Sequence, residues 1–157
     1  YPEQAISPNR NKKVDQNPSE FRRSIYLPIV RGNVPAALTV FDFPAPEMLV
    51  GNRPVTTVPA QALFMMNSPF VVSQAEQTAS KLLSDTQQSD RQRVSQLYLA
   101  CLGRDATAAE QTEAVQYIDA LKQQNAKENT DPKTATQKAW ASYCQILFAS
   151  TEFRFLN

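Results

Sequence analysis

Proline is distributed very unevenly along this chain of 157 residues. Ten of its eleven prolines lie in the first half, and only Pro132 lies in the second. Proline fixes φ, removes a backbone donor and pushes the preceding residue away from helical geometry, so the first half favours turns and extended backbone. We therefore expect an all-α fold in which an extended, proline-rich N-terminal arm precedes a bundle of five or six helices.

Length and composition are those of one globular domain. With 42% hydrophobic and 20% charged residues, the chain can bury a core of ordinary size. Residues 1–20 are polar and are interpreted as a linker or arm, and residues 21–157 are predicted to form a single helical domain. Because residues 1–20 carry no apolar segment of the signal-peptide kind, we interpret the chain as the C-terminal fragment of a larger protein.

The charges of the chain are balanced. Sixteen basic and fifteen acidic residues give a net charge of +1, which exerts no long-range attraction on a polyanion. We therefore expect no nucleic-acid partner. No apolar run has the length that a transmembrane helix needs, so no membrane span is predicted.

The chain contains no histidine. Serine–histidine and cysteine–histidine nucleophile pairs, histidine metal ligands and a histidine-ligated haem are therefore excluded within it. Cys101 and Cys144 cannot hold a structural zinc alone, and we interpret both as small core residues. The alternative is a disulfide between neighbouring helices in an oxidising compartment. We expect no catalytic residue, no metal site and no cofactor in this fragment.

The second half of the chain carries apolar residues at helical spacing. Start signals predict helices from Ser68, from Ser89 or Asp90, from Thr107 and from Asp131, and Gly103 is expected to close the second of them. The polar residues 122–129 are interpreted as a solvated loop. The predicted buried stripes are Val71, Ala75, Ala79, Leu82 and Leu83; Val94, Leu97, Tyr98, Cys101 and Leu102; Ala114, Tyr117, Ile118 and Leu121; and Ala139, Trp140, Tyr143, Cys144, Leu147 and Phe148.

In the segment 52–70, a short apolar run is flanked by polar residues that favour helix caps, turns or buried hydrogen bonds. Thr56 or Thr57 can cap a helix that Pro59 opens, and Asn67 suits its end because asparagine tolerates left-handed backbone. These threonines, with Gln61 and Asn67, are expected to satisfy backbone groups, and a polar ligand groove is the alternative. The residues of this helix that we interpret as core are Phe64, Met65 and Met66.

Between Phe21 and Pro54 the only basic residues are four arginines, with no lysine among them: Arg22, Arg23, Arg31 and Arg53. The structural interpretation pairs Arg23 or Arg53 with Asp42, and we predict an Asp42–Arg53 ion pair. The functional alternative is an anion pocket, since the arginine fork suits carboxylates and other anions. In that case the candidate ligand-binding residues are Arg23, Arg53, Gln61 and Asn67. A surface without a role is the third reading.

Several of these segments also occur together, in the same order, in a known family. They are Arg22-Arg23-Ser24-Ile25-Tyr26-Leu27-Pro28, Phe41-Asp42-Phe43-Pro44, Arg53 to Pro59, Gln61-Ala62-Leu63, Asn67-Ser68-Pro69-Phe70, Leu97-Tyr98, Leu102-Gly103-Arg104, Trp140, Gln145-Ile146-Leu147 and Ser150-Thr151-Glu152-Phe153. On these motifs the chain resembles the C-terminal part of the planctomycete domain of unknown function numbered fifteen-fifty-three, found in large cytochrome-c-associated proteins. The resemblance covers Phe21 to Phe155.

The resemblance implies an exported or periplasmic parent protein with a haem-binding region and a companion domain placed before this one. It implies no established activity and no catalytic residue. This chain has no Cys-x-x-Cys-His motif, so any haem belongs elsewhere in the parent. We predict a non-enzymatic interaction or scaffold module that docks against other domains of its parent chain. The alternative is part of an enzyme acting on complex carbohydrate, completed by missing segments, with Arg53 and Gln61 as contacts.

Overall fold

The computed structural model describes residues 29, 34–44, 51, 59–127 and 131–154. Within these ranges every regular element is a helix, so the all-α prediction is confirmed. The chain divides into two compact units, Tyr1–Thr57 and Val58–Asn157, and each is described by itself. The predicted linker at 1–20 and most of the predicted arm lie outside the described residues.

The described part of the first unit centres on the short helix α1 (Ala36–Val40). Pro35 precedes α1 with a φ of −54°, and the carbonyl of Pro35 accepts hydrogen bonds from the backbone N–H groups of Leu38 and Thr39. Asp42 follows the helix with a φ of 58°, in the left-handed region that aspartate adopts more readily than most residues. The left-handed backbone at Asp42 therefore prevents α1 from continuing past this residue.

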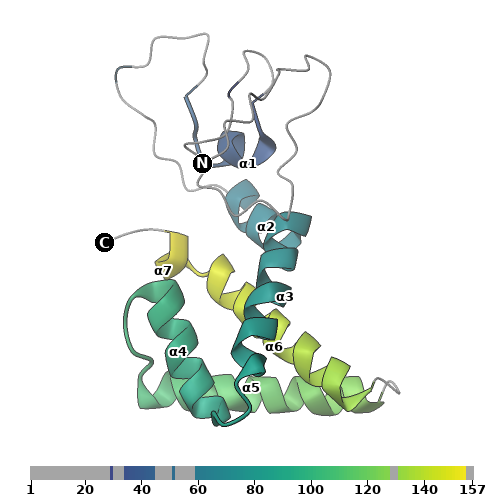
Figure 1. The fold of residues 1–157 in the computed structure, drawn as a ribbon. Coiled ribbons are helices and arrows are strands. Elements are labelled where there is room, and N and C mark those ends of the chain that lie inside the picture. The colour runs from purple at the N-terminus through teal and green to yellow at the C-terminus, as the bar shows by residue number, and fades with distance from the viewer. Residues whose placement is uncertain (1–28, 30–33, 45–50, 52–58, 128–130, 155–157) are drawn as a thin grey trace, which may run out of the picture. The chain divides into compact units, whose positions relative to one another are not determined.

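The second unit is a set of helices arranged around α6 (Figure 1). α6 (Pro132–Ala149) packs most extensively against α3 and α5 and also contacts the other helices of this unit. In Figure 1, α3 crosses α6, and α5 runs along the end of the unit where α3 stops and α4 starts. The remaining helices are α2 (Pro59–Asn67), α3 (Pro69–Ser84), α4 (Asp90–Leu102), α5 (Ala108–Lys127) and α7 (Thr151–Arg154).

The core of the second unit is built from the predicted apolar stripes. Residues of α3, α4, α5 and α6 contribute to one continuous cluster, and the predicted stripe residues within it are buried or partly buried. These stripe predictions are confirmed, because residues spaced three or four apart share one face of a helix. The largest side chains without solvent exposure are Trp140, Leu97, Ile118, Val94 and Cys144.

The helix ends at Ser89, Gly103 and Asp131 follow the predicted signals, whereas Asn67 ends α2 without the left-handed backbone expected there. Ser89 caps α4 in a capping box, in which its hydroxyl accepts from the Gln92 N–H and the Gln92 side chain accepts from the Ser89 N–H. Gly103 ends α4 with a φ of 71°, a conformation that glycine adopts without steric cost. The Asp131 carboxylate accepts from two backbone N–H groups at the start of α6. The sequence thus fixes where these helices start and stop.

The predicted loop is wrong for residues 122–127, because α5 continues to Lys127, and residues 128 and 129 lie outside the described residues. Polarity misled the prediction: lysine, glutamine and alanine are good helix formers even where they face water. Contacts with α4 and α6 also stabilise this extension of α5. Lys122 Nζ lies 2.7 Å from Asp90 Oδ2 on α4, and Asn125 Nδ2 donates to the carbonyl of Ala135 on α6 at 3.4 Å.

Candidate functional site

The arginine-based site predicted from the sequence cannot be placed. Arg23 and Arg53 lie outside the described residues, as do the other two arginines of that group, so the anion pocket and the Asp42–Arg53 ion pair stay predictions. The structure places Asp42 two residues after the end of α1, in the first unit.

Two of the predicted ligand-binding residues lie on α2. Gln61 is 3% exposed and, with Met65, forms the buried side of this helix. Asn67 is exposed at the last position of α2, and its Nδ2 donates to the Leu63 carbonyl one turn earlier, at 2.9 Å. This hydrogen bond satisfies a backbone carbonyl. A ligand role for Gln61 or Asn67 stays a prediction.

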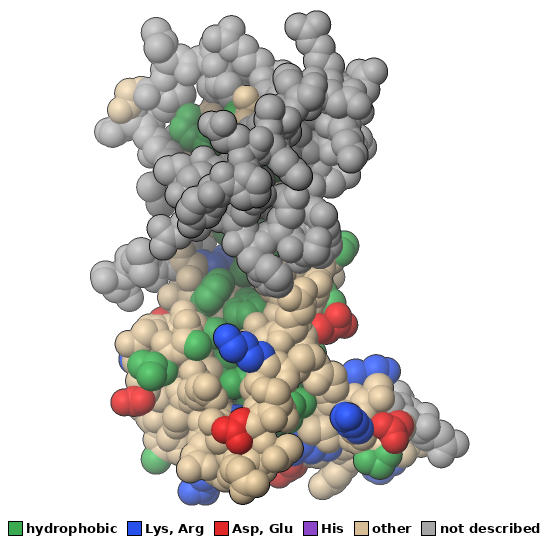
Figure 2. Space-filling view, in the orientation of Figure 1, with side chains coloured by type: hydrophobic (Ala, Val, Ile, Leu, Met, Phe, Trp, Pro, Cys, Tyr) green, Lys and Arg blue, Asp and Glu red, His purple; other side chains and the backbone are tan. Residues whose placement is uncertain are grey.

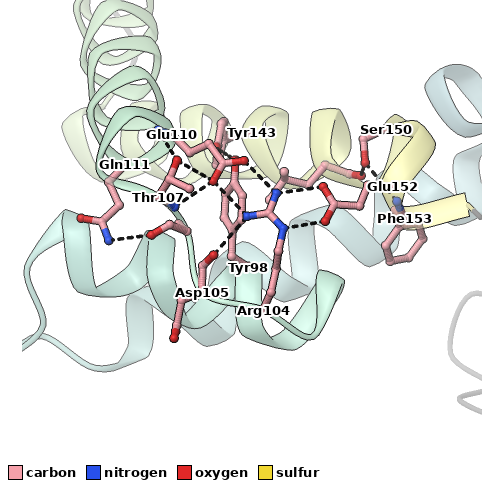
Figure 3. Close-up of polar contacts among 12 residues, drawn as sticks. Tyr98, Arg104, Asp105, Thr107, Glu110, Gln111, Tyr143, Ser150, Glu152 and Phe153 are labelled. Carbon is pink, nitrogen blue, oxygen red and sulfur yellow. Dashed lines mark hydrogen bonds and ion pairs between the residues drawn. The ribbon is translucent and has the colours of Figure 1, made fainter. Parts of the chain in front are cut away.

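The most highly connected polar cluster described in the structure centres on Arg104 (Figure 3). Its guanidinium lies between Glu110 of α5 and Glu152 of α7. Nε and Nη2 donate to the two oxygens of Glu152 at 2.6 and 2.8 Å, and Nη1 and Nη2 donate to Glu110 at 2.9 and 2.8 Å. Nη1 also donates to the Asp105 carbonyl at 3.0 Å. We name these three charged residues the Arg104 cluster.

Local sequence places two members of the Arg104 cluster. The left-handed Gly103 turns the chain off the end of α4, and Arg104 is the next residue. Glu110 is held by a capping box: its Oε2 accepts from the Thr107 N–H at 2.8 Å, while the Thr107 hydroxyl accepts from the Glu110 N–H at 3.3 Å. The fork of Arg104 and the carboxylate of Glu110 therefore meet across the α4–α5 connection.

An aromatic ring lies against the Arg104 guanidinium. Arg104 Cζ is 5.3 Å from the ring centroid of Tyr98, within the range of a cation–π contact. The Tyr98 hydroxyl lies 3.4 Å from the hydroxyl of Tyr143 on α6, inside the core. Burial is the main cause that raises the pKa of Tyr143 well above its usual range. Tyr143 therefore stays neutral, and the two tyrosines connect the Arg104 cluster to the core.

The charges of the cluster stabilise one another. The hydrogen bonds that Arg104 donates to Glu152 and then to Glu110 raise the pKa of Arg104, so it stays protonated at every accessible pH. The hydrogen bond from Arg104 is the main cause that lowers the pKa of Glu110 to about 2, and the Thr107 N–H adds to it. The same arginine lowers the pKa of Glu152. At neutral pH both carboxylates are charged.

These shifts predict an acid-dependent loss of stability. The pKa of Glu110 falls from 4.5 to about 2 on folding, so its contribution is complete above 4.5 and disappears as the pH falls towards 2. We expect the wild-type chain to lose more stability over this range than the Glu110→Gln variant. Glutamine keeps an acceptor for the Thr107 N–H but carries no titratable charge. Urea unfolding at a series of pH values measures the difference between the two proteins.

The chain offers a matched control in Gln92→Glu, which adds a carboxylate to the other capping box, at Ser89, and leaves the arginine cluster intact. This variant should follow the wild-type pH profile more closely than Glu110→Gln does. Parallel wild-type and Glu110→Gln profiles between pH 4.5 and 2 would show that the Arg104–Glu110 contact contributes nothing to stability.

The Arg104 cluster is chemically satisfied. Arginine has five N–H donors, and five hydrogen bonds to Glu110, Glu152 and Asp105 use them. Burial raises the pKa of the Cys101 thiol, and it raises that of Cys144 to about 12, so neither free cysteine is an activated nucleophile. In the described part of the chain, no group of three or more acidic or cysteine residues could hold a metal ion.

A second ionic cluster holds the α3–α4 corner. Arg93 Nη1 pairs with Asp90 at 2.8 Å, while its Nε and Nη2 donate to the carbonyls of Leu82 and Asp85 at the end of α3, at 3.3 and 2.8 Å. These contacts satisfy carbonyls that have no partner within their own helix. Their role is structural.

The outer side of α2 is apolar and exposed. Leu63 is 58% and Met66 is 57% exposed, whereas Met65 is 8% exposed. The prediction that Met66 is a core residue is therefore wrong, and that for Met65 is right. α2 buries only one side, and Leu63 and Met66, three residues apart, lie together on the other. In Figure 2, hydrophobic side chains gather near the C-terminal end of α6.

The sequence contained a signal for the Arg104 cluster that residue-by-residue reasoning missed. Arg104 and Glu152 lie in two of the motifs that carry the family resemblance, Leu102-Gly103-Arg104 and Ser150-Thr151-Glu152-Phe153. They are 48 residues apart in the chain and form an ion pair in the structure. Two motifs that lie far apart in the sequence therefore contact each other in the structure.

Comparison with known proteins gives one result. A family described as "PSD1: Protein of unknown function (DUF1553)" matches residues 1–118. The match starts before the expected Phe21 and ends within α5, so it does not extend to α6 or α7. No curated protein and no solved structure matches the chain.

Proposed function

We propose that the second unit of this chain, which belongs to the PSD1 family of proteins of unknown function (DUF1553), is a non-enzymatic docking module. Its partners are other domains of a large exported parent protein. The cytochrome-c association and planctomycete origin that the motifs imply are part of this proposal. Any haem is carried outside this chain. No helix in the described ranges combines the length and apolarity needed to cross a membrane.

The observation that carries the proposal is the exposed apolar side of α2. This helix contains no charged residue, and the side opposite Gln61 and Met65 presents Leu63 and Met66 to solvent. Large apolar side chains exposed together on one face often mark an interaction surface. Covering both side chains with a partner contributes up to about 1.5–3 kcal/mol for each, which is enough to drive docking once the partner is tethered nearby.

The carbohydrate-enzyme alternative receives no support from the described residues. Trp140 is 0% exposed, so its ring face cannot stack on a sugar. Gln61 is buried on α2, and Arg53 lies outside the described residues. The cluster around Arg104 contains a bound arginine and two bound carboxylates, with no carboxyl group left to act as acid or base.

Methionine oxidation tests the docking proposal with an internal control. Peroxide should oxidise Met66 about tenfold faster than the adjacent Met65 in the isolated chain, because the reaction follows exposure. In the longer parent protein, we expect the rate at Met66 to fall to that of Met65. Tandem mass spectrometry resolves the two sites. Equal rates at Met66 in the isolated chain and the parent protein would refute docking through α2.

A further inference from the structure

α7 is a small element whose contacts with the rest of its unit include those of two side chains, Glu152 and Phe153. It spans four residues, none of them buried, and follows Ser150, whose backbone is extended at φ −64° and ψ 153°. Glu152 binds Arg104, and the Phe153 ring lies 5.2 Å from the Phe148 ring of α6. Exposed ion pairs contribute little to stability, so α7 is a candidate for local opening.

We propose that Arg104, Tyr98 and Phe148 form a binding site for a peptide with an acidic residue followed by an aromatic residue. α7 occupies this site within its own chain through Glu152 and Phe153, and so keeps it closed. The inference is independent of the α2 surface. The partner carries the same two groups as α7, a carboxylate followed by an aromatic ring.

The acidic half of the site is preorganised. Glu152 receives two parallel hydrogen bonds from Arg104, at 2.6 and 2.8 Å, in the fork geometry that selects a carboxylate. The opposite edge of the guanidinium is bound to Glu110 and to the Asp105 carbonyl, and Tyr98 lies against its face. These three contacts do not involve α7, so the fork keeps its orientation when α7 leaves.

The aromatic half of the site lies on α6. Phe148 is partly buried against the core, which fixes its position, and the Phe153 ring packs on it with an interplanar angle of 39°. Such a tilted ring pair favours an aromatic residue over an aliphatic one. The carboxylate and the ring come from adjacent residues of α7, so a short segment satisfies both halves.

A peptide-binding experiment on the full chain tests the proposal. The variant Glu152→Gln with Phe153→Ser removes both side chains that occupy the site and leaves the site residues unchanged. The probe is a capped peptide of residues 150–154, and the control peptide carries glutamine in place of Glu152. Two-dimensional NMR follows the Arg104 side-chain N–H and the Phe148 amide during titration.

We expect the variant to bind the probe in the millimolar range with shifts at Arg104 and Phe148, and to bind the glutamine peptide at least tenfold more weakly. The wild-type chain should bind the probe about tenfold more weakly than the variant, because its site is open only part of the time. Equal binding of the two peptides by a folded variant, or no shift at millimolar probe, overturns the proposal.

Hydrogen exchange in the wild-type chain gives a second, variant-free measurement. The Phe153 amide, which donates to the Ser150 hydroxyl at 3.2 Å, should exchange through local opening at least tenfold faster than the Cys144 amide in the middle of α6. Exchange of both amides at the same rate, set by unfolding of the whole unit, would show that α7 does not open, and the proposal would fail even if the variant did not fold.

Discussion

Replacing Trp140 with alanine should lower the free energy of unfolding of the second unit by about 3–5 kcal/mol. Trp140 is the largest fully buried side chain and lies on α6, the helix that contacts every other helix of this unit. Alanine removes the indole from the centre of the core, and the surrounding helices cannot close the cavity completely. Urea unfolding followed by far-ultraviolet circular dichroism measures the loss.

Two further variants separate the cavity from other effects. Trp140→Phe keeps most of the apolar volume and removes an indole N–H that has no hydrogen-bond partner in the described part of the chain, so its cost should be less than half that of alanine. Leu99→Ala removes an exposed side chain from α4 and should change stability by less than about 0.5 kcal/mol. Similar losses for Trp140→Ala and Leu99→Ala would contradict the central position of the indole.

The sequence predicted this core because burial follows helical periodicity. Leu97, Ile118 and Trp140 each lie on a stripe that repeats at three and four residues, and all three are fully buried. Helix ends were predictable for a related reason: Ser89 and Gly103 act through hydrogen bonds and backbone angles within a few residues. Because such signals act over a few residues, they can be recognised in a single sequence.

The Arg104 cluster depends on the tertiary fold and could not be derived in the same way. The pairing of Arg104 with Glu152 requires α6 to return past α4, which no local pattern specifies. The exposed side of α2 illustrates the same limit, since Met65 and Met66 are chemically identical and only packing distinguishes them. Polarity is equally ambiguous, as the helical Lys122 shows: a polar residue fits a loop or the outer face of a helix.

Replacing Ala79 with leucine should also destabilise the second unit strongly, by about 1–3 kcal/mol. Ala79 is 0% exposed on α3, and the most extensive helix contact of the unit joins α3 to α6. Small side chains line both helices, with Ala75 on α3 and Ala135 and Ala139 on α6, all buried. A larger side chain at Ala79 must push the two helices apart or leave its preferred rotamer. Urea unfolding monitored by tryptophan fluorescence reports the change.

Ala100→Leu is the matched control for this prediction. Ala100 is exposed on α4, and leucine has nearly the same helix propensity as alanine, so this substitution should change stability by less than about 0.5 kcal/mol. A difference between the two variants then measures steric crowding alone. Equal effects would mean that α3 and α6 can separate at little cost, and the buried alanines would no longer explain how closely these helices pack.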